Sequence, residues 1–381
     1  MQIDIIRTEA GLHQLEGDWR ALEASARFRV PFQTFDWNAA WWRAMHEDKL
    51  GVRDELALRA LRDGGRLVAV APLVLTSRPG RGPLRARTLQ FFGADPNITE
   101  LRGLAVAPED ADAAWDALIA HVQAGADGWD AMNWDGVRAG SPAAARLEAL
   151  PGFAWKRDIP SFELPLQGTW EEMKSAFPRN LKESLRKCYN SLKRDSLEFE
   201  LQVSSTWEQI QPALDTFLEL HTRRAQHEEG VRHGNVFEAP AARRFLLDVS
   251  ERFARRGAMR VFGLRIQGRI VATRLAFVLG DTLYLFYSGF DPEYGKYSVM
   301  TTCVAEAIQH AAQNGFKRVH LSTGSDQSKL RWRPEETIIR SGSQVSPTRR
   351  GQLADQGVKL AVRAMELPVA GVLRRFLLRR S

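Results

Sequence analysis

The segment from Tyr284 to Trp332 constrains this chain most strongly, because strand and helix patterns alternate along it in a fixed order. An apolar strand leads through a short polar loop into an amphipathic helix, a second strand follows, and the segment ends in a polar turn that contains Lys329. Such an order places a helix N-terminus at one edge of a sheet, where free backbone N–H groups can bind an anionic cofactor or substrate. The pattern therefore predicts an α/β fold with a ligand site at this edge.

The same order of elements occurs twice. In the C-terminal half, the strands Met259–Ile266 and Arg269–Leu279 flank a Gln-Gly turn, and the strand Thr282–Phe290, the helix Val299–Gln313 and the strand Arg318–Thr323 follow. In the N-terminal half, a hairpin, a strand, a helix and a strand are expected at 56–76, 89–92, 109–124 and 131–137. We infer a duplicated α/β domain, although two unrelated α+β domains can give the same order because hairpins and helices are common. The expected divisions are 1–160, 161–340 and a basic tail at 341–381.

Composition bounds the class of protein. A chain of 381 residues with 44% hydrophobic content can bury two cores. Two cysteines, Cys188 and Cys303, cannot form a disulfide framework, and no His/Cys cluster has zinc-ligand spacing, so we expect reduced thiols and no metal. The N-terminus lacks a secretory signal pattern, and no run of about 18 apolar residues occurs. We therefore expect a cytoplasmic protein.

The net charge of +7 is concentrated at the C-terminal end. From residue 349 onward there are eight Lys/Arg and two acidic residues, so the remainder is near neutral. Two amphipathic pieces at 358–380 are separated by Pro368, and Val372, Leu373 and Phe376 share one face of the second. This pattern suits either a helix at the inner face of the membrane or one that packs on the protein body. No motif that reads a DNA groove occurs.

Between the halves, the segment 178–195 predicts a helix with a basic face. Basic residues at 179, 182, 186 and 193 share one side of this helix. Apolar residues at 181, 185, 188 and 192 share the other side. Such a face is either simply solvated or a docking surface for the phosphates of a nucleotide, a coenzyme or a lipid head group.

Several short motifs follow one another as they do in a known family. They are the basic helix at 179–193, Leu220-His221-x-x-Arg224, a hairpin with Gly268 that leads to Ala272, Tyr287-Ser288-Gly289-Phe290-Asp291-Pro292, Tyr297-Ser298, and Gly324-x-x-x-x-Lys329-x-x-Trp332. With these motifs the chain resembles the Gcn5-related acyltransferase (GNAT) superfamily. It is most similar to the CelD-like or BioF2-like acetyltransferase branch, which is related to the Fem-type aminoacyltransferases of peptidoglycan. The resemblance implies tandem GNAT-like domains, each a mixed, mainly antiparallel sheet flanked by helices.

The chain departs from the family pattern at the expected cofactor loop. Val299 and Met300 stand where the branch commonly has Pro-Gly, and without glycine the backbone approaches an anion less easily. The broad superfamily signature, Gln/Arg-x-x-Gly-x-Gly/Ala, does not occur before this helix, and Ser328 stands where a tyrosine usually precedes the lysine. The sequence therefore leaves the cofactor and the activity of the site open.

The resemblance implies acyl transfer from a carrier thioester to an amine, which requires an amine to lose a proton and a carbonyl to be polarised. Lys329 can support the oxyanion or bind a phosphate, and Asp326 can orient or deprotonate the amine. Strand alternation puts Leu285 and Tyr287 on one face, so the Tyr287 hydroxyl can reach the cleft. His221 can act as a base because imidazole titrates near neutrality. Each of these residues also has a structural interpretation, as a surface lysine, a turn former, a core tyrosine or a packed histidine.

The donor implied by the resemblance is acyl-CoA, held at the N-terminus of the 299–313 helix. Ser298 predicts an N-cap for this helix. The complete set of expected cofactor-binding residues is Lys296, Tyr297, Ser298, Val299, Met300 and Arg331.

The favoured function is an N-acyltransferase that acts on an amine of a sugar or of a cell-envelope or exopolysaccharide precursor; the acceptor class comes from the family association. A second interpretation is a Fem-like transferase that uses aminoacyl-tRNA. A third is a non-catalytic adaptor at the membrane, which the basic tail and the Val299-Met300 departure suggest.

Overall fold

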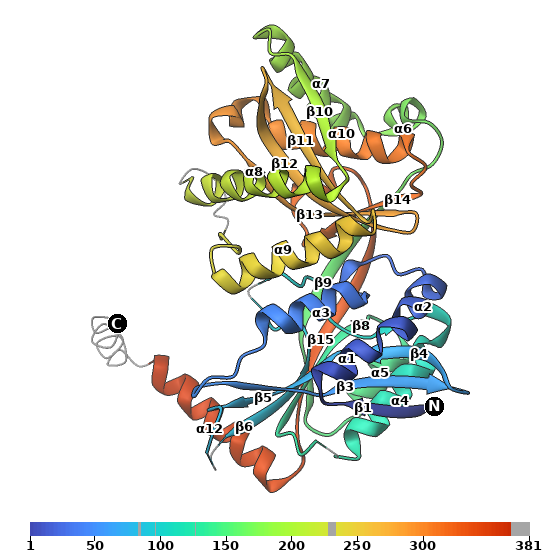
Figure 1. Ribbon diagram of the computed structural model, residues 1–381, viewed down its shortest axis with the longest axis vertical. Helices are drawn as coiled ribbons and strands as arrows, with labels where there is room; N and C mark the ends of the chain where they lie inside the picture. The colour runs from blue at the N-terminus through green and yellow to red at the C-terminus, as the bar shows by residue number, and fades with distance from the viewer. Residues whose placement is uncertain (83–84, 96, 126, 228–233, 367–381) are drawn as a thin grey trace.

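The computed structural model describes residues 1–381 except 83–84, 96, 126, 228–233 and 367–381, and the side chains of 358–359 and 361–366 also lie outside the described part. Two lobes lie one above the other along the long axis of the molecule (Figure 1). An eleven-stranded sheet runs through both lobes in the order β10-β11-β12-β13-β14-β9-β15-β8-β6-β5-β2. A separate four-stranded sheet, β1-β3-β4-β7, belongs to the N-terminal lobe.

The N-terminal lobe is built from short strands and helices. They are β1 (Gln2–Ile6), α1 (Glu9–Gln14), α2 (Glu16–Ala26), η1 (Pro31–Gln33), α3 (Phe35–Met45), β2 (Arg53–Leu56), β3 (Leu58–Asp63), β4 (Arg66–Ala71), β5 (Leu73–Arg78), β6 (Ala86–Phe91), β7 (Ala105–Val106), η2 (Pro108–Asp110), α4 (Ala111–Gln123), β8 (Ala131–Arg138) and α5 (Pro142–Glu148).

The C-terminal lobe follows the long strand β9 (Phe153–Pro165) and precedes the long strand β15 (Glu335–Val345). Its elements are α6 (Trp170–Ala176), α7 (Arg179–Arg194), β10 (Phe199–Ser204), α8 (Trp207–Gln226), α9 (Pro240–Arg255), β11 (Met259–Ile266), β12 (Arg269–Leu279), β13 (Thr282–Phe290), η3 (Pro292–Tyr297), α10 (Val299–Gln313), β14 (Arg318–Thr323) and α11 (Gln327–Leu330). The bounds of β11, β12, β13, α10 and β14 are those predicted from the sequence. Gln267 and Gly268 both have positive φ, at 49° and 80°, as a two-residue type I′ hairpin turn requires.

The predicted duplication is confirmed by a strand–helix–strand unit in each lobe. In the C-terminal lobe, β13 and β14 are parallel and α10 connects them; in the N-terminal lobe, β6 and β8 are parallel and α4 lies between them in the chain. The hairpins differ, because β3 and β4 leave the large sheet for the four-stranded one, whereas β11 and β12 stay in it. Each lobe is therefore a mixed, mainly antiparallel sheet with flanking helices.

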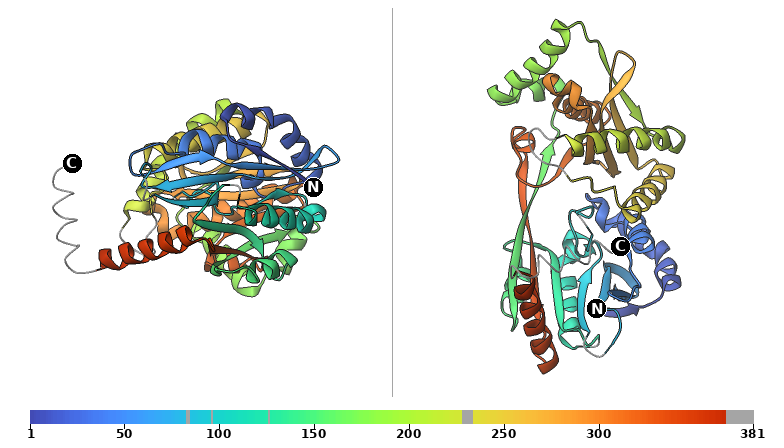
Figure 2. Two further views of the ribbon diagram at one scale, coloured as in Figure 1. Left: turned by 90° about the horizontal axis from the view of Figure 1, so that it is seen from below. Right: turned by 90° about the vertical axis from the view of Figure 1, so that its left-hand side faces the viewer.

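Strands β9 and β15 join the lobes. β9 pairs with β14 of the C-terminal lobe and with β15, and β15 pairs with β8 of the N-terminal lobe. Figure 2 shows these two strands side by side along the length of the molecule. The divisions expected at 160/161 and 340/341 lie inside β9 and β15. Because both strands serve both lobes, backbone hydrogen bonds fix the lobes relative to each other.

The basic helix forms where the sequence predicted it, whereas the segment expected as the tail begins inside β15 and becomes helical at Arg349. In α7, Leu181, Leu185 and Leu192 are buried, while the lysines and arginines face outward. The tail contains α12 (Arg349–Glu366), which projects from the N-terminal lobe (Figure 1) and exposes Leu353 and Leu360. The second amphipathic piece expected after Pro368 lies outside the described residues. Within the described part, no helix has the length and apolar character needed to span a bilayer.

Aromatic side chains from both lobes form one shared core. Trp37 of α3 is 1% exposed and makes edge contacts with Phe245 of α9 and Phe286 of β13, with ring centroids 4.9 and 5.6 Å apart. Trp41 and Trp42 of the same helix are buried as well. This contact places the N-terminal helix α3 directly against the sheet of the C-terminal lobe.

A buried carboxylate ties the lobes together near this core. Asp36 is 1% exposed and accepts hydrogen bonds from Arg20 of its own lobe (2.9 Å) and from Arg256 of the other lobe (2.7 Å). Burial alone raises the pKa of Asp36, but the hydrogen bonds and charges of the two arginines outweigh it, so the pKa lies below its usual value.

We expect Asp36→Ala to lower the free energy of unfolding by about 2 kcal/mol at pH 7, because the charge-assisted hydrogen bonds from two arginines are lost. A depressed carboxyl pKa stabilises the fold above the unfolded pKa of about 3.9 and loses this effect as the pH falls below it. Urea unfolding at pH 7 and pH 3 measures both effects. Glu251→Ala, which removes the exposed Glu251–Arg255 pair, is the control and should change stability by less than about 0.5 kcal/mol. Equal losses in the two variants would contradict the role of Asp36.

Candidate functional site

The site begins where β13 separates from β14. Their parallel ladder contains three residue pairs and ends at Tyr284↔His320, although β13 continues to Phe290 and β14 to Thr323. On its other side, β13 has a bulge, because its register with β12 shifts between Arg274 and Ala276. The bulge turns β13 away from β14, and the facing edges of the two strands open onto a pocket.

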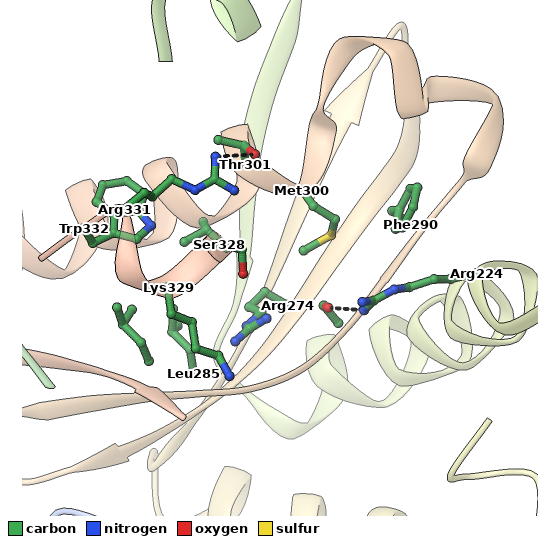
Figure 3. A pocket seen from close by; sticks show the side chains of 13 residues that line it. Arg224, Arg274, Leu285, Phe290, Met300, Thr301, Ser328, Lys329, Arg331 and Trp332 are labelled. Atoms are coloured by element: carbon green, nitrogen blue, oxygen red, sulfur yellow. Dashed lines mark hydrogen bonds between the residues drawn. The ribbon is translucent and has the colours of Figure 1, made fainter. Parts of the chain in front are cut away.

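This pocket encloses about 200 Å³ and is lined by both apolar and cationic side chains (Figure 3). The apolar side chains come from β13, α10, β14 and the turn after α11: Leu285, Phe290, Met300, Val304, Leu321 and Trp332. The cations are Arg224, Arg274, Lys329 and Arg331. Such a pocket suits a ligand with both an apolar chain and anionic groups.

The N-terminus of α10 forms the outer end of this pocket. Met300 and Thr301 line it, and the first backbone N–H groups of a helix have no partner within the helix. Arg331 lies over this end, with its Nη1 3.4 Å from Thr301 Oγ1 and 3.4 Å from Ser184 Oγ of α7. The predicted basic helix α7 therefore lies beside the same helix end.

The predicted N-cap at Ser298 is wrong. Ser298 has φ 54° and ψ 41°, a left-handed conformation, and its side chain makes no capping hydrogen bond. Lys296 lies over the ring of Tyr297, 4.8 Å from its centroid, and the Tyr297 hydroxyl donates to Asp195 (2.8 Å). Val299 is buried in the core. Of the six expected cofactor residues, Met300 and Arg331 line the pocket.

Lys329 is held at the inner end of the pocket. Its ammonium donates to the carbonyls of Thr323 and Gly324 and lies 3.0 Å from Asp326 Oδ2, and 16% of its side chain is exposed. Burial raises the pKa of Asp326, but hydrogen bonds from Ser328 and Lys329 outweigh it and leave the pKa low. Asp326 therefore acts as a counter-ion that orients Lys329.

Two arginines that were not proposed as site residues complete the cationic lining. Arg224 of α8 donates to Ser288 Oγ (2.9 Å), and burial together with the charge of Arg274 lowers the pKa of Arg224 to about 10. Burial also lowers the pKa of Arg274, against the opposing charge of Glu100. Arg224 belongs to the Leu-His-x-x-Arg motif of the sequence, but only the fold shows that its side chain reaches the pocket.

The expected position of Tyr287 is wrong, and the bulge explains why. Regular alternation would put Leu285 and Tyr287 on one face, but Leu285 lines the pocket while Tyr287 packs against His221 and Phe237 on the opposite side of β13. The Tyr287 hydroxyl donates to the carbonyl of Asn97 (2.6 Å). An extra residue in a strand reverses the faces of the residues that follow it.

His221 also lies behind β13. It is 3% exposed, its Nδ1 is 3.0 Å from the Ser288 carbonyl oxygen, and burial lowers its pKa. Gly289 has no space for a side chain, because a Cβ atom built on it would lie 2.5 Å from the backbone nitrogen of His221. His221 therefore holds the carbonyl of the bulge, and a catalytic role for it remains a prediction.

A buried polar cluster lies at the last β13–β14 pair. His320 is 1% exposed and stacks on Tyr284 with ring centroids 4.3 Å apart. Its Nδ1 accepts from the Ser322 N–H (3.0 Å), so the proton lies on Nε2, which donates to Ser161 Oγ (3.0 Å). Burial and the charge of Lys329 lower the pKa of His320 to about 3.

Comparisons with known proteins agree with this architecture. Residues 179–330 match the family model described as acetyltransferase (GNAT) domain. FemX is similar in structure, with a TM-score of 0.61 at 13% identity over 93% of this chain and 99% of FemX. A conserved protein of unknown function from Bacteroides thetaiotaomicron has a TM-score of 0.51 at 14% identity, over 91% of this chain and 100% of that protein's chain. The C-terminal domain of a putative lysylphosphatidylglycerol synthetase from Agrobacterium fabrum has a TM-score of 0.50 at 14% identity, over 91% of this chain and 96% of that domain's chain.

The search of curated proteins by sequence found no match. Residues 179–330 are a GNAT domain, and at these identities the likeness to the solved structures shows a shared fold over nearly the whole chain. The GNAT domain expected from the sequence is thus confirmed for residues 179–330, and the expected likeness to Fem-type proteins is found in the fold.

We expect the stability of the protein to fall as the pH drops below the unfolded histidine pKa of about 6.5. In the unfolded chain His320 then binds a proton, whereas in the folded protein it stays neutral. The slope from this residue is about 1.4 kcal/mol per pH unit until the folded pKa is reached. Denaturant unfolding from pH 7.5 to 5 measures it in the wild type and in His320→Asn, which should lack this slope. His13→Gln, on an exposed position of α1, is the control. Parallel pH curves for wild type and His320→Asn would contradict the assignment.

Proposed function

We propose that this chain, whose residues 179–330 form a GNAT domain, is an N-acyltransferase that uses acyl-CoA. The proposed acceptor is an amine of a sugar or of a cell-envelope or exopolysaccharide precursor, as the family resemblance suggests. The observation that carries the proposal is the pocket between the separated strands β13 and β14, with the N-terminus of α10 at its outer end and Lys329 at its inner end.

The strand edges suit the extended, amide-containing arm of coenzyme A. Backbone groups beyond Tyr284 and His320 lie outside the β13–β14 ladder, and an amide chain inserted there can pair with them as an added strand does. The apolar side chains provide contact for the methylene groups of such an arm. A carrier with these features is a better match for this pocket than a compact polar ligand.

The phosphates of the donor have cations at the outer end. Arg331 lies at the start of α10, where the helix dipole and free N–H groups favour an anion. The exposed basic face of α7 continues from there, with Lys182 and Arg186 in solvent. Arginine supplies planar, two-point contacts to phosphate, and lysine adds a point charge.

The reacting carbonyl is proposed to lie near Lys329. Two backbone carbonyls and Asp326 fix the ammonium, so its charge is already in place when negative charge develops on the acyl oxygen. Removal of a fixed group that stabilises a developing oxyanion typically lowers the rate by about 10²–10³-fold.

We expect acetyl-CoA or a longer acyl-CoA at 100 times its dissociation constant to stabilise the wild type by about 2.7 kcal/mol in a thermal melt. Arg331→Ala should weaken binding about tenfold, because it removes a charged contact worth about 1.4 kcal/mol. Lys329→Ala should bind the donor but release thiol at least about 10²-fold more slowly with an amine acceptor. Arg243→Ala, on the exposed face of α9, is the matched control.

The pattern of failure in this melt separates the alternatives. No stabilisation by any coenzyme A ester, with salt-dependent tRNA binding, favours a Fem-like aminoacyl transferase, to which the shared fold with FemX also points. No ligand of either kind, with wild-type function in cells for Lys329→Ala, favours the adaptor.

We also propose a cytoplasmic location with peripheral contact between the tail and the inner face of the membrane. Leu353 and Leu360 are 68% and 65% exposed and lie seven residues apart on α12, and the tail sequence is basic. Replacing both leucines by Asp should reduce co-sedimentation with anionic vesicles at least about tenfold, since each loses its apolar insertion. Leu50→Asp, at a position that is 80% exposed, is the control. Unchanged vesicle binding would exclude α12 as the contact.

A further inference from the structure

A loop of the N-terminal lobe places a carboxylate where β13 and β14 separate. The loop connects β6 to β7, and Asp95 fixes its conformation. Asp95 Oδ1 accepts from the backbone N–H groups of Ile98 (2.7 Å) and Thr99 (3.1 Å), and Oδ2 accepts from Trp41 Nε1 (2.9 Å). Glu100 follows directly and points at the other lobe.

Glu100 binds both separating strands. It accepts a hydrogen bond from the Tyr284 hydroxyl of β13, and its two carboxylate oxygens lie 2.8 and 2.7 Å from Ser322 Oγ of β14. Tyr284 belongs to the last paired position, and Ser322 lies just beyond it. The residues next to these two, Leu285 and Leu321, line the pocket. The carboxylate therefore lies next to residues of β13 and β14 that adjoin the lining of the proposed donor pocket.

The surroundings of Glu100 suit a group that exchanges protons. Burial raises its pKa, and the hydrogen bonds from Tyr284 and Ser322 and the charges of Lys329 and Arg274 oppose that rise. Glu100 as a whole residue is half-buried in the folded protein. A carboxyl with a raised pKa is a stronger base than an ordinary one.

Other titratable groups near the pocket are engaged elsewhere. Both ring nitrogens of His320 have partners, and the Asp326 carboxylate is paired with Lys329. His221 and Tyr287 lie behind β13. Glu100, by contrast, binds both separating strands and comes from the lobe opposite α10.

We propose that Glu100, supplied by the N-terminal lobe, is the general base that takes the proton from the acceptor amine. This inference rests on the proposed function. The nitrogen lone pair forms the new C–N bond while the carbonyl electrons move to oxygen, and a nitrogen proton passes to the Glu100 carboxylate. The carbonyl then re-forms, the C–S bond breaks, the thiolate takes a proton from solvent, and Glu100 releases its proton to solvent.

The test is a pH–rate profile for thiol release by wild type, Glu100→Gln and Glu100→Asp, with donor affinity measured in parallel. Glutamine keeps an oxygen for Tyr284 and Ser322 but cannot take the proton. We expect Glu100→Gln to lower kcat by about 10²–10⁴-fold and to lose the acidic limb of the profile, with donor affinity within about twofold of wild type. Glu100→Asp should keep a titrating limb with partial activity.

Glu23→Gln is the matched control. Glu23 is a second interlobe carboxylate with a raised pKa caused by burial, but it accepts from the Phe35 N–H and pairs with Arg256, away from the pocket. Its variant should keep the wild-type profile. An active wild type whose acidic limb survives in Glu100→Gln overturns the inference and leaves the proposed function intact. A wild type that releases no thiol with any amine overturns the proposed function, and with it the assignment of Glu100 as the general base.

Discussion

The pairing between β13 and β14 stops after three residue pairs, and the whole candidate site depends on that short ladder. Buried backbone N–H and C=O groups need partners, so neighbouring strands normally stay together along their length. Here the bulge opposite Arg274 turns β13 aside and leaves two strand edges facing one pocket. An extended ligand with amide groups can satisfy those edges, and the N-terminus of α10 lies where the anionic end of such a ligand would be.

The second requirement is that the two lobes do not move relative to each other. β9 and β15 pair across both lobes, Trp37 packs into the sheet of the C-terminal lobe, and Asp36 binds arginines from both sides. A loop of one lobe can therefore hold Glu100 within hydrogen-bond distance of two strands of the other. Catalytic geometry tolerates errors of only about 0.5 Å, which a flexible joint would exceed.

The pocket carries an excess of positive charge. Four cations line it, Asp326 pairs with Lys329, and Glu100 interacts through its charge with Lys329 and Arg274. Partial burial strengthens these interactions, because water screens them less than it screens surface pairs. An anionic ligand gains from this excess, whereas the neutral His320 adds no competing charge at physiological pH. The same excess supports an oxyanion near Lys329.

The sequence by itself determined the elements of the C-terminal lobe, the duplication and the motif that ends at Lys329, because local periodicity and turn residues such as Gln267-Gly268 act over a few residues. It also pointed to Met300 and Arg331. It could not place Tyr287, because a bulge depends on pairing with β12. Nor could it find Glu100, which lies 184 residues from Tyr284 in a loop without a motif. Contacts of that separation arise only when the lobes pack, so tertiary structure alone decided which side chains share the site.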